Sequence, residues 1–243
     1  MKSYTYENLN STSLEAARLV KQNNSLPFAV TSAQQSQGKG RQGKTWLSPK
    51  GNLYLSFALT PPKKVSKILP LKVGALISLW LKEELGLSIT LKWPNDLVFK
   101  GQKLGGILCE ATWQKNQISC LIVGIGINVA HAPKIKDYQS CCLNELTSKH
   151  FCVDQLTKSL IAYWQKHWSF LDDKKALQLY QSHHLPVGQL WWNQSEKVFY
   201  KDHGISKQGS LITQNLITRK FIEQSSAHHP LTLYYGATAT SSS

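Results

Sequence analysis

Three short segments of the sequence concentrate residue types that can bind and activate an anionic substrate. The first, Gly38–Trp46 (GKGRQGKTW), holds three glycines, three cations and one indole within nine residues. Glycines let backbone N–H groups approach an anion closely, and fixed cations offset its charge. The composition fits a phosphate-binding loop or a solvated connection, and Trp46 could stack on a purine ring or anchor the loop.

The second segment combines a turn with a lysine-bearing strand. It reads KWPND at Lys92–Asp96 and continues as KLGGILCE at Lys103–Glu110. Pro94 imposes an extended or turned backbone on the residue before it, which directs the following Asn and Asp out of the sheet. Asp96 is the only carboxylate between positions 85 and 109. It could ligate Mg²⁺ or orient a lysine, and the alternative is an Asx turn that pairs with its own backbone.

The third segment, GIGIN at Gly124–Asn128, places two glycines in a run of β-type residues. Glycine weakens a strand interior, and it often marks a site where a ligand or another backbone comes close. We therefore expect this segment to border the same site as the first two.

The charge of the chain is strongly positive and unevenly distributed. The 28 Lys and Arg residues outnumber the 14 Asp and Glu, giving a formal net charge of +14. Positions 16–82 carry eleven Lys or Arg and no carboxylate. This pattern fits a nucleic-acid surface, a site for polyanionic substrates or simple solubility, and charge alone does not choose among them.

The composition excludes several other classes of protein. Hydrophobic residues make up 42% of the 243 and charged residues 17%, as in ordinary globular proteins. No apolar run approaches the ~18 residues of a membrane span, and the N-terminus lacks the apolar core of a signal peptide, so we expect a cytoplasmic protein. The five cysteines form no C-x-x-C pair. A metal cluster of Cys141, Cys142, His150 and Cys152 would match no familiar ligand spacing.

The elements that must position these segments follow from periodicity and from capping signals. Thr12 to Glu15 fits an S/T-x-x-E capping box with Thr12 as the N-cap. Gly86 is the expected C-cap of a long apolar helix. Up to residue 85 we predict a helix at 13–22, strands at 27–34 and 52–59, a loop at 35–46 and a helix at 66–85.

The rest of the chain predicts a mainly antiparallel run of strands, then helices, then a small β domain. The expected strands are 89–93, 97–99, 103–112 and 118–128, followed by a helix at 153–171 and a shorter one ending near 181. From 186 to 235, short β-like stretches broken by glycines predict a β-barrel. We place the domain boundary between residues 182 and 183, with domains at 1–182 and 183–243.

The three segments resemble the signatures of the biotin protein ligases (biotin–acetyl-CoA-carboxylase ligases). That family has a G-R-G-R-x-G-R-x-W loop, a K-W-P-N-D turn, a K-L-x-G-I-L-x-E strand and a G-x-G-I-N strand, and all four occur here in order. The resemblance runs from Ser11 to Asn128 and resumes weakly at 204–209. Lys39 and Lys44 stand where the family has arginine, and Ser13 stands where it has Asn.

The resemblance implies an α/β (α+β) fold. It consists of a class II aminoacyl-tRNA synthetase-like catalytic domain with a mixed, mainly antiparallel sheet, and a small C-terminal β-barrel. The implied reaction joins biotin to ATP as biotinyl-5′-AMP, with Mg²⁺, and then transfers biotin to a lysine of the biotin carboxyl carrier protein. Two anions must meet in this reaction, and unit charges ~4 Å apart repel by about 4 kcal/mol at an effective dielectric near 20. A cation-rich wall removes that repulsion.

Matching positions carry the family's roles onto this chain. The implied catalytic residues are Lys103, Arg41 and Asp96, with Asp96 also the candidate Mg²⁺ ligand. The implied biotin-binding residues are Ser11, Thr12, Ser13, Gln35, Gly38, Lys39, Gly40, Arg41, Lys103, Gly106, Gly124 and Gly126. The implied ATP-binding residues are Arg41, Lys44, Trp46, Lys92, Asn95 and Asn128.

Three alternatives stand beside this assignment. A lipoate or octanoate ligase or transferase shares the fold, although the K-W-P-N-D and G-x-G-I-N pair argues against it. A nucleic-acid-binding regulator would need a helix-turn-helix, for which the ten residues before Ser11 leave no room. A catalytically silent homologue is disfavoured by the intact Lys103 and Arg41. We expect a single-function enzyme, a monomer or homodimer, with no specific nucleic-acid partner and no membrane association.

Overall fold

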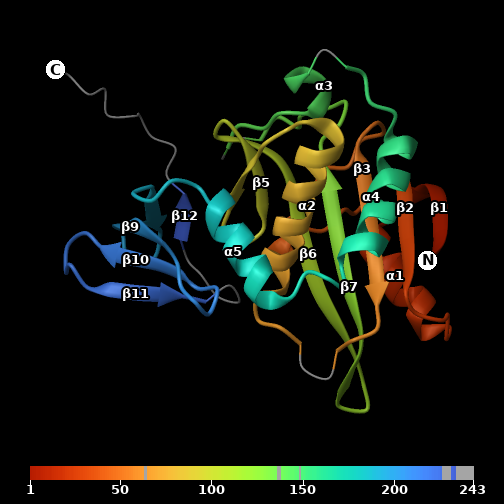
Figure 1. The fold of residues 1–243 in the computed structure, drawn as a ribbon, viewed down its shortest axis with the longest axis horizontal. Coiled ribbons are helices and arrows are strands. Elements are labelled where there is room, and N and C mark those ends of the chain that lie inside the picture. Colours follow the sequence, from red (N-terminus) through yellow and green to blue (C-terminus); the bar gives the residue numbers. More distant parts are fainter. Residues whose placement is uncertain (63–64, 136–137, 148, 226–230, 234–243) are drawn as a thin grey trace.

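A computed structural model describes residues 1–62, 65–135, 138–147, 149–225 and, for the backbone alone, 231–233. Seven strands form one sheet in the order β1-β2-β3-β7-β6-β5-β4 (Figure 1). The strands are β1 (Lys2–Leu9), β2 (Phe28–Gln35), β3 (Leu53–Leu59), β4 (Thr90–Lys92), β5 (Asp96–Phe99), β6 (Gln102–Gln114) and β7 (Gln117–Ile127). β1 pairs parallel with β2 and the other neighbours pair antiparallel. The predicted mixed, mainly antiparallel sheet is confirmed.

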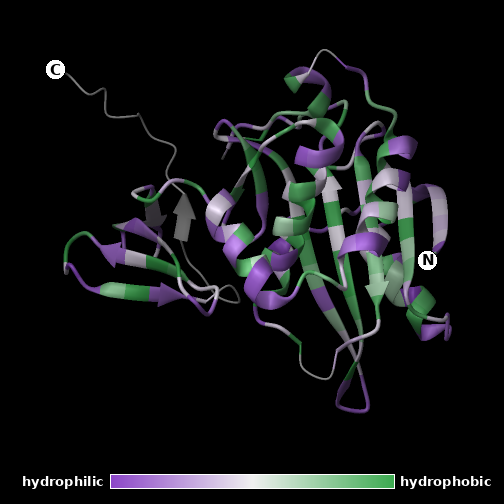
Figure 2. Cartoon of the chain, viewed as in Figure 1, coloured by the Kyte–Doolittle hydropathy of each residue, from purple (hydrophilic) through white to green (hydrophobic). Residues whose placement is uncertain are grey.

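Helices cover both faces of this sheet, because the central strands alternate apolar side chains between the faces. Along β7, Leu121 and Val123 join the large core on one face, whereas Cys120 and Ile122 join a smaller core on the other. The smaller core contains α1 (Thr12–Lys21). The larger core contains α2 (Leu69–Leu85), α4 (Val153–His167) and α5 (Asp173–His183). Figure 2 shows hydrophobic residues concentrated in the central strands and hydrophilic ones at the far end of the β6–β7 hairpin.

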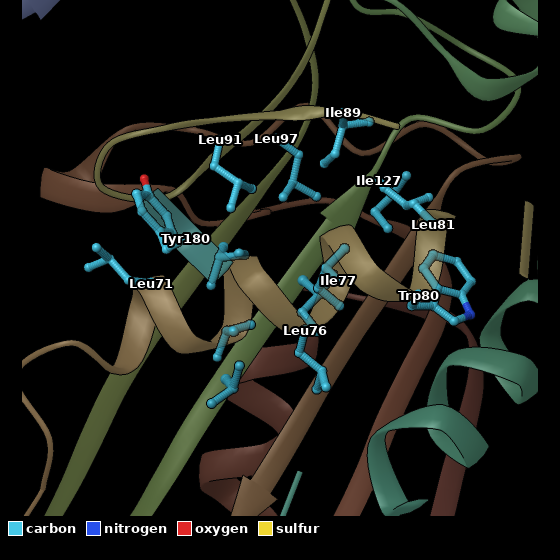
Figure 3. Close-up of a cluster of buried hydrophobic side chains, with 14 of the residues drawn as sticks. Leu71, Leu76, Ile77, Trp80, Leu81, Ile89, Leu91, Leu97, Ile127 and Tyr180 are labelled. Atoms are coloured by element: carbon cyan, nitrogen blue, oxygen red, sulfur yellow. The ribbon is translucent and has the colours of Figure 1, made fainter. Parts of the chain in front are cut away.

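The centre of the larger core is α2, which is apolar around most of its surface. Figure 3 shows Leu76, Ile77 and Trp80 of α2 facing the strands, with Tyr180 of α5 beside Leu91. Gly86 ends α2 in a left-handed conformation with φ 69°, as the sequence predicts. Fully burying such apolar side chains stabilises the fold by roughly 1.5–3 kcal/mol each.

The structure corrects the predicted start of the chain in two ways. Residues 2–9 form the edge strand β1, which the sequence analysis missed. The predicted capping box is wrong, because Ser11 is the N-cap and no side chain caps the helix there. Glu15 instead accepts hydrogen bonds from the Tyr6 hydroxyl and from Arg18. The Thr12 backbone N–H, which the box would have paired with the Glu15 side chain, donates instead to Gln35 Oε1 at 2.8 Å.

Helix boundaries elsewhere shift by a few residues from the predicted ones. α2 begins at Leu69 rather than at residue 66, with a proline in its first turn. α4 ends at His167 rather than at residue 171. A short helix, α3 (Leu143–Leu146), was not predicted.

The C-terminal part of the chain forms a second, five-stranded antiparallel sheet in the order β11-β10-β9-β8-β12. Its strands are β8 (Leu190–Asn193), β9 (Val198–Ile205), β10 (Leu211–Asn215), β11 (Phe221–Gln224) and β12 (Leu231–Leu233). The sheet lies beside α5 (Figure 1). One connection to the seven-stranded part of the molecule is Trp93 Nε1, which donates to the Gly209 carbonyl at 3.1 Å. Part of the predicted barrel, 226–230 and 234–235, lies outside the described residues, and the boundary at 182 stays a prediction.

The structure bears on two features that the sequence analysis considered, a membrane-spanning helix and a metal-binding cluster. Within the described residues, no helix combines the length and apolar character that a membrane crossing requires. Among the same residues, no group of three or more His, Cys, Asp or Glu side chains is arranged to hold a metal ion.

Candidate active site

The site lies where the β7 residues on the face toward α1 change from bulky side chains to glycine. On β7, Cys120 and Ile122 pack toward α1, and the next residues on that face are Gly124 and Gly126. Beyond the N-terminus of α1, the sheet surface is therefore hollow. The hollow is a cavity of ≈ 560 Å³ bordered by the loop that follows β2 and by the start of β8. This volume lies within the ordinary range for small-molecule sites.

One end of the cavity is a network of hydroxyl and amide groups at the N-terminus of α1. Gln35 Oε1 accepts from the Thr12 backbone N–H at 2.8 Å and from the Thr12 hydroxyl at 3.2 Å. The Thr12 hydroxyl also lies 2.8 Å from Ser56 Oγ, and Ser11 Oγ lies 3.0 Å from Ser13 Oγ. The serines and threonine of this end are buried. Such a network suits a ligand that both donates and accepts hydrogen bonds.

The glycine-rich loop is folded back on itself beside this network. The Trp46 backbone N–H donates to the Gly38 carbonyl at 2.8 Å, and the Gly40 N–H donates to the Lys44 carbonyl at 2.7 Å. A Cβ at Gly38 would overlap the Trp46 carbonyl and the Ser48 hydroxyl, so this position requires glycine. Gly38 itself does not line the cavity, although the sequence analysis placed it among the binding residues.

The indole of Trp46 lies directly on the glycine floor. A Cβ at Gly126 would come 2.7 Å from Trp46 Nε1, and one at Gly106 would come 3.3 Å from the same ring. Trp46 Nε1 is buried with no hydrogen-bond partner among the described residues. Gly106 and Gly126 both border the cavity, and in this structure the space above them holds Trp46. A Cβ at Gly124 would lie an ordinary 3.6 Å from Ser56 Oγ.

The opposite end of the cavity is cationic and centres on Lys103. Lys103 Nζ lies 2.7 Å from Asp96 Oδ1, and Lys92 Nζ lies 3.8 Å from Asp96 Oδ2. The Lys103 ammonium also lies 5.2 Å from the centroid of Trp46 and 5.0 Å from that of Tyr138. A carboxylate and two aromatic rings thus fix one ammonium in place. Burial lowers the pKa of Lys92, an effect that Asp96 opposes and Lys103 reinforces.

Arginine and further lysines extend the positive surface toward the mouth of the cavity. Arg41 Nη1 donates to Asn95 Oδ1 at 3.3 Å, which ties the loop to the KWPND turn. Burial lowers the pKa of Arg41, and Asp96 opposes this effect, yet arginine stays charged in proteins. Lys39 is exposed and also lines the cavity, as does Lys44.

The charge balance of the lining is strongly positive. Five cationic side chains border the cavity against one carboxylate, Asp96, among the described lining residues. That carboxylate is engaged by the Lys92 and Lys103 ammonium groups. Mg²⁺ usually needs one or two carboxylates together with substrate phosphates, and two ammonium groups beside Asp96 oppose a divalent cation. The residues present therefore do not form a protein Mg²⁺ site, and the geometry favours the alternative in which Asp96 orients a lysine.

One predicted nucleotide contact lies away from the cavity lining. Asn128 is buried, and its Nδ2 donates to the Cys141 carbonyl at 3.0 Å and lies 3.4 Å from the Lys103 carbonyl. In this structure the Asn128 side chain holds neighbouring backbone segments together. Apart from Gly38 and Asn128, the predicted site residues all border the cavity, in the set Ser11, Thr12, Ser13, Gln35, Lys39, Gly40, Arg41, Lys44, Trp46, Lys92, Asn95, Asp96, Lys103, Gly106, Gly124 and Gly126.

Comparison with known proteins places this geometry in a family. The model of the biotin/lipoate A/B protein ligase family matches residues 7–128, which include the whole α1 network, the glycine-rich loop and both glycine strands. The chain belongs to this family.

Relatives in the biotin/lipoate ligase family include several biotin ligases. The chain is 32% identical over 130 residues to the biotin–[acetyl-CoA-carboxylase] ligase of Paracoccus denitrificans, covering 51% of this chain and 53% of that protein. It is 33% identical over 128 residues to the bifunctional ligase/repressor BirA of Bacillus subtilis, covering 51% and 39%. The chain thus spans about two fifths to one half of the length of these relatives.

A solved structure extends the likeness over nearly the whole chain. The biotin protein ligase of Aquifex aeolicus in complex with biotin and ATP superposes with a TM-score of 0.76 at 29% identity. The match covers 96% of this chain and 98% of that one. The likeness therefore includes the C-terminal sheet, which the family model does not reach.

Several cavity residues of this family member were not predicted from sequence. Ser56 lies in β3. The sequence signal that could have identified it as a site residue is a hydroxyl side chain within the run LYLSFAL. Tyr138, Trp191 and Trp192 come from segments far away in the chain, and no local pattern marks them. A wider groove of ≈ 1020 Å³ lies on the other side of Gln35 and contains the Glu15–Arg18 ion pair rather than a cation cluster. It therefore lacks the electrostatics that an anionic substrate needs.

Proposed function

We propose that this chain is an ATP-dependent ligase that activates biotin as biotinyl-5′-AMP and transfers it to a lysine of a biotin carboxyl carrier protein. The observation that carries the proposal is the division of one cavity into two ends. A buried hydroxyl and amide network lies at the first end, and the Lys92–Asp96–Lys103 cluster lies at the second. A ligand with a polar head and a carboxylate tail can span both.

The cationic end suits the first step of the reaction. An oxygen of the biotin carboxylate attacks the α-phosphorus of ATP, the bond to the bridging oxygen breaks, and pyrophosphate leaves with the electron pair. Lys103 stands where both the carboxylate and the α-phosphate require positive charge, and Arg41 borders the same space. Fixed charges aimed at the phosphorus stabilise the negative charge that builds up in the transition state. Lys39, Lys44 and Lys92 would offset the charge of the remaining phosphates.

The polar end supports biotin rather than lipoate as the acid. The ureido ring of biotin carries N–H donors and a carbonyl acceptor, which can pair with Ser11, Thr12 and Gln35. The dithiolane ring of lipoate has no such groups and would leave these buried polar atoms without partners, which is costly. The names of the relatives agree with this choice.

The second step needs an amine to reach the mixed anhydride. The lysine nitrogen attacks the acyl carbon, the bond to the AMP oxygen breaks, and the amine loses a proton. Asp96 is the carboxylate of the described lining that can attract and orient this lysine. The Paracoccus relative is named for acetyl-CoA carboxylase, and a carrier protein of that enzyme is the acceptor we propose. The proposed compartment is the cytoplasm.

Magnesium enters this proposal as part of the nucleotide. Because Asp96 is held by two ammonium groups, the ion would be coordinated chiefly by ATP phosphate oxygens and water. Its contribution would be to shield the leaving pyrophosphate.

The experiment that tests the function is a transfer assay with labelled acids. The purified chain is incubated with MgATP, an acceptor carrier domain, and either biotin or lipoate. We expect biotin to appear on the carrier lysine, at a rate far above that of lipoate. Transfer of lipoate without biotin would move the chain to the lipoate branch of the family, and transfer of neither would overturn the proposal.

A further inference from the structure

A fully buried carboxylate in the C-terminal sheet lies close behind the cavity. Asp202 of β9 is 0% exposed. Its Oδ1 accepts from the Gly204 N–H at 2.6 Å, and its Oδ2 lies 3.2 Å from His184 Nε2 and 3.3 Å from Trp191 Nε1. A buried carboxylate is costly unless it is paired and hydrogen-bonded. The Asp202 carboxylate and its three partners, the Gly204 N–H, His184 and Trp191, therefore form one hydrogen-bonded cluster.

His184 connects this carboxylate to the strand that bears Lys92. Its Nδ1 lies 3.1 Å from the carbonyl oxygen of Leu91 in β4, and its side chain is 4% exposed. A carbonyl and a carboxylate only accept hydrogen bonds, and the His184 ring lies between the two. The Leu185 N–H also donates to the Leu91 carbonyl at 3.1 Å, which fixes that part of β4 a second time.

Trp191 provides a second connection from Asp202 to Lys92. The indole N–H of Trp191 is directed at Asp202 Oδ2, and the ring borders the cavity although the residue is 1% exposed. Lys92 Nζ lies 6.0 Å from the centroid of that ring, within the outer range of a cation–π contact. Lys92 directly follows Leu91 in the chain. Both paths from Asp202 therefore converge on one lysine of the site.

The need for such a support follows from the position of Lys92. Its ammonium is buried beside a second ammonium, that of Lys103, and both share Asp96. Burial and the neighbouring positive charge disfavour this arrangement, so a flexible lysine would tend to move toward solvent. Figure 3 shows Leu91 held in the core beside Tyr180, and the Tyr180 ring stacks at 5.9 Å on His184.

We propose that Asp202 and His184 are positioning residues that hold Lys92 in the nucleotide half of the cavity, and that this is how the C-terminal sheet contributes to the reaction. The inference rests on the proposed ligase function. Neither residue borders the cavity, so neither is expected to touch substrate. Their effect should appear in nucleotide use and not in biotin binding, because the network of Thr12 and Gln35 belongs to other elements.

The test compares two substitutions of Asp202. In Asp202→Leu both connections are lost, and we expect kcat/KM for ATP in adenylate formation to fall by about tenfold or more, since small misplacements in a site are costly. The dissociation constant for biotin, measured by calorimetry without ATP, should stay within about twofold. Asp202→Asn keeps a polar side chain of the same shape that can still bond His184, so it should recover much of the loss. Thermal unfolding verifies that both variants are folded.

A control variant in the same sheet distinguishes the loss of Lys92 positioning from a general loss of stability in the C-terminal sheet. Thr213 of β10 is 0% exposed and pairs with Asp202 across the strands, and its hydroxyl donates to the Ile222 carbonyl rather than to the Asp202 cluster. Thr213→Ala should lower the melting temperature with little change in kcat/KM for ATP. Equal kinetic losses in Thr213→Ala and Asp202→Leu would overturn the proposal, as would wild-type kinetics in Asp202→Leu. An inactive wild-type chain would instead overturn the ligase function itself.

Discussion

The Lys103 ammonium is bound to the Asp96 carboxylate at 2.7 Å, although Lys103 lies on β6 and Asp96 begins β5. The antiparallel pairing of the two strands brings these side chains together, with Val98 opposite Lys103 and Gly106 opposite Asp96. The pair places one fixed positive charge at the centre of the cationic end of the cavity. The proposed chemistry depends on this charge more than on any other.

Replacing Lys103 should therefore affect the chemical step more than the fold. We expect Lys103→Ala to lower the rate of adenylate formation by about 10²–10³-fold, because one preorganised charge is removed from the transition state. Pyrophosphate release measures this rate. Lys44→Ala is the matched control, since Lys44 lines the mouth and is exposed, and it should lose much less. A Lys103→Ala enzyme with the wild-type rate would remove Lys103 from its role.

The two glycines of β7 form a second test, because their surroundings differ. A Cβ at Gly126 would come 2.7 Å from Trp46 Nε1, whereas one at Gly124 meets Ser56 Oγ at 3.6 Å. Overpacking typically costs about 1–3 kcal/mol, so Gly126→Ala should weaken biotin binding by roughly 5- to 150-fold through displacement of Trp46. Gly124→Ala should remain close to wild type. Calorimetry measures both, and the reverse order would show that Trp46 does not rest on Gly126 in solution.

Ser56 offers a test of the polar end. Its hydroxyl lies 2.8 Å from the Thr12 hydroxyl, which also bonds Gln35. Loss of one such hydrogen bond in Ser56→Ala should weaken biotin binding by about 1 kcal/mol, or roughly fivefold. KM for ATP should not change. An effect on ATP alone would place the acid at the other end of the cavity.

The magnesium requirement should reside in the nucleotide. Since Asp96 is paired with Lys92 and Lys103, the chain without ATP should show no calorimetric binding of Mg²⁺. Asp96→Asn should leave the Mg²⁺ concentration for half-maximal adenylation unchanged, although the rate itself falls. A large increase in that concentration would make Asp96 a metal ligand.

Stability at alkaline pH should depend on the buried thiols. Burial raises the pKa of Cys120 from 9.0 to about 11, so the folded state favours the neutral thiol. Its stabilising contribution is complete below pH 9 and is lost as the pH rises toward 11, with a slope on the order of 1.4 kcal/mol per pH unit. Urea unfolding from pH 8 to 11 should show a smaller decline for Cys120→Ala than for wild type. Parallel declines in the two proteins would contradict a buried, neutral Cys120.

Much of the fold could be predicted from local signals. The apolar run before Gly86, the alternation in β3 and the long strands β6 and β7 each carry a strong periodic pattern. The strand β1 was missed because it is an edge strand whose polar residues face solvent. The capping box failed because a tertiary contact from Gln35 replaced a local one at Thr12.

The site was predictable where glycines and cations cluster in sequence, and not where it is completed by distant elements. The glycine loop, the KWPND turn and the GIGIN strand all reach the cavity. Trp191 and Tyr138 border the cavity only because tertiary folding brings them there. Asn128 was predicted as a site residue, but its side-chain amide donates to the Cys141 backbone carbonyl. Sequence also gave no indication that Trp46 would cover the glycine floor.

The most direct test of the central claim is detection of the adenylate itself. The purified chain is mixed with biotin and MgATP, without any acceptor, and the products are analysed by mass spectrometry. The account predicts biotinyl-5′-AMP and an equal amount of pyrophosphate, with neither formed when biotin is omitted. Release of ADP and phosphate, or no nucleotide product at all, would contradict it.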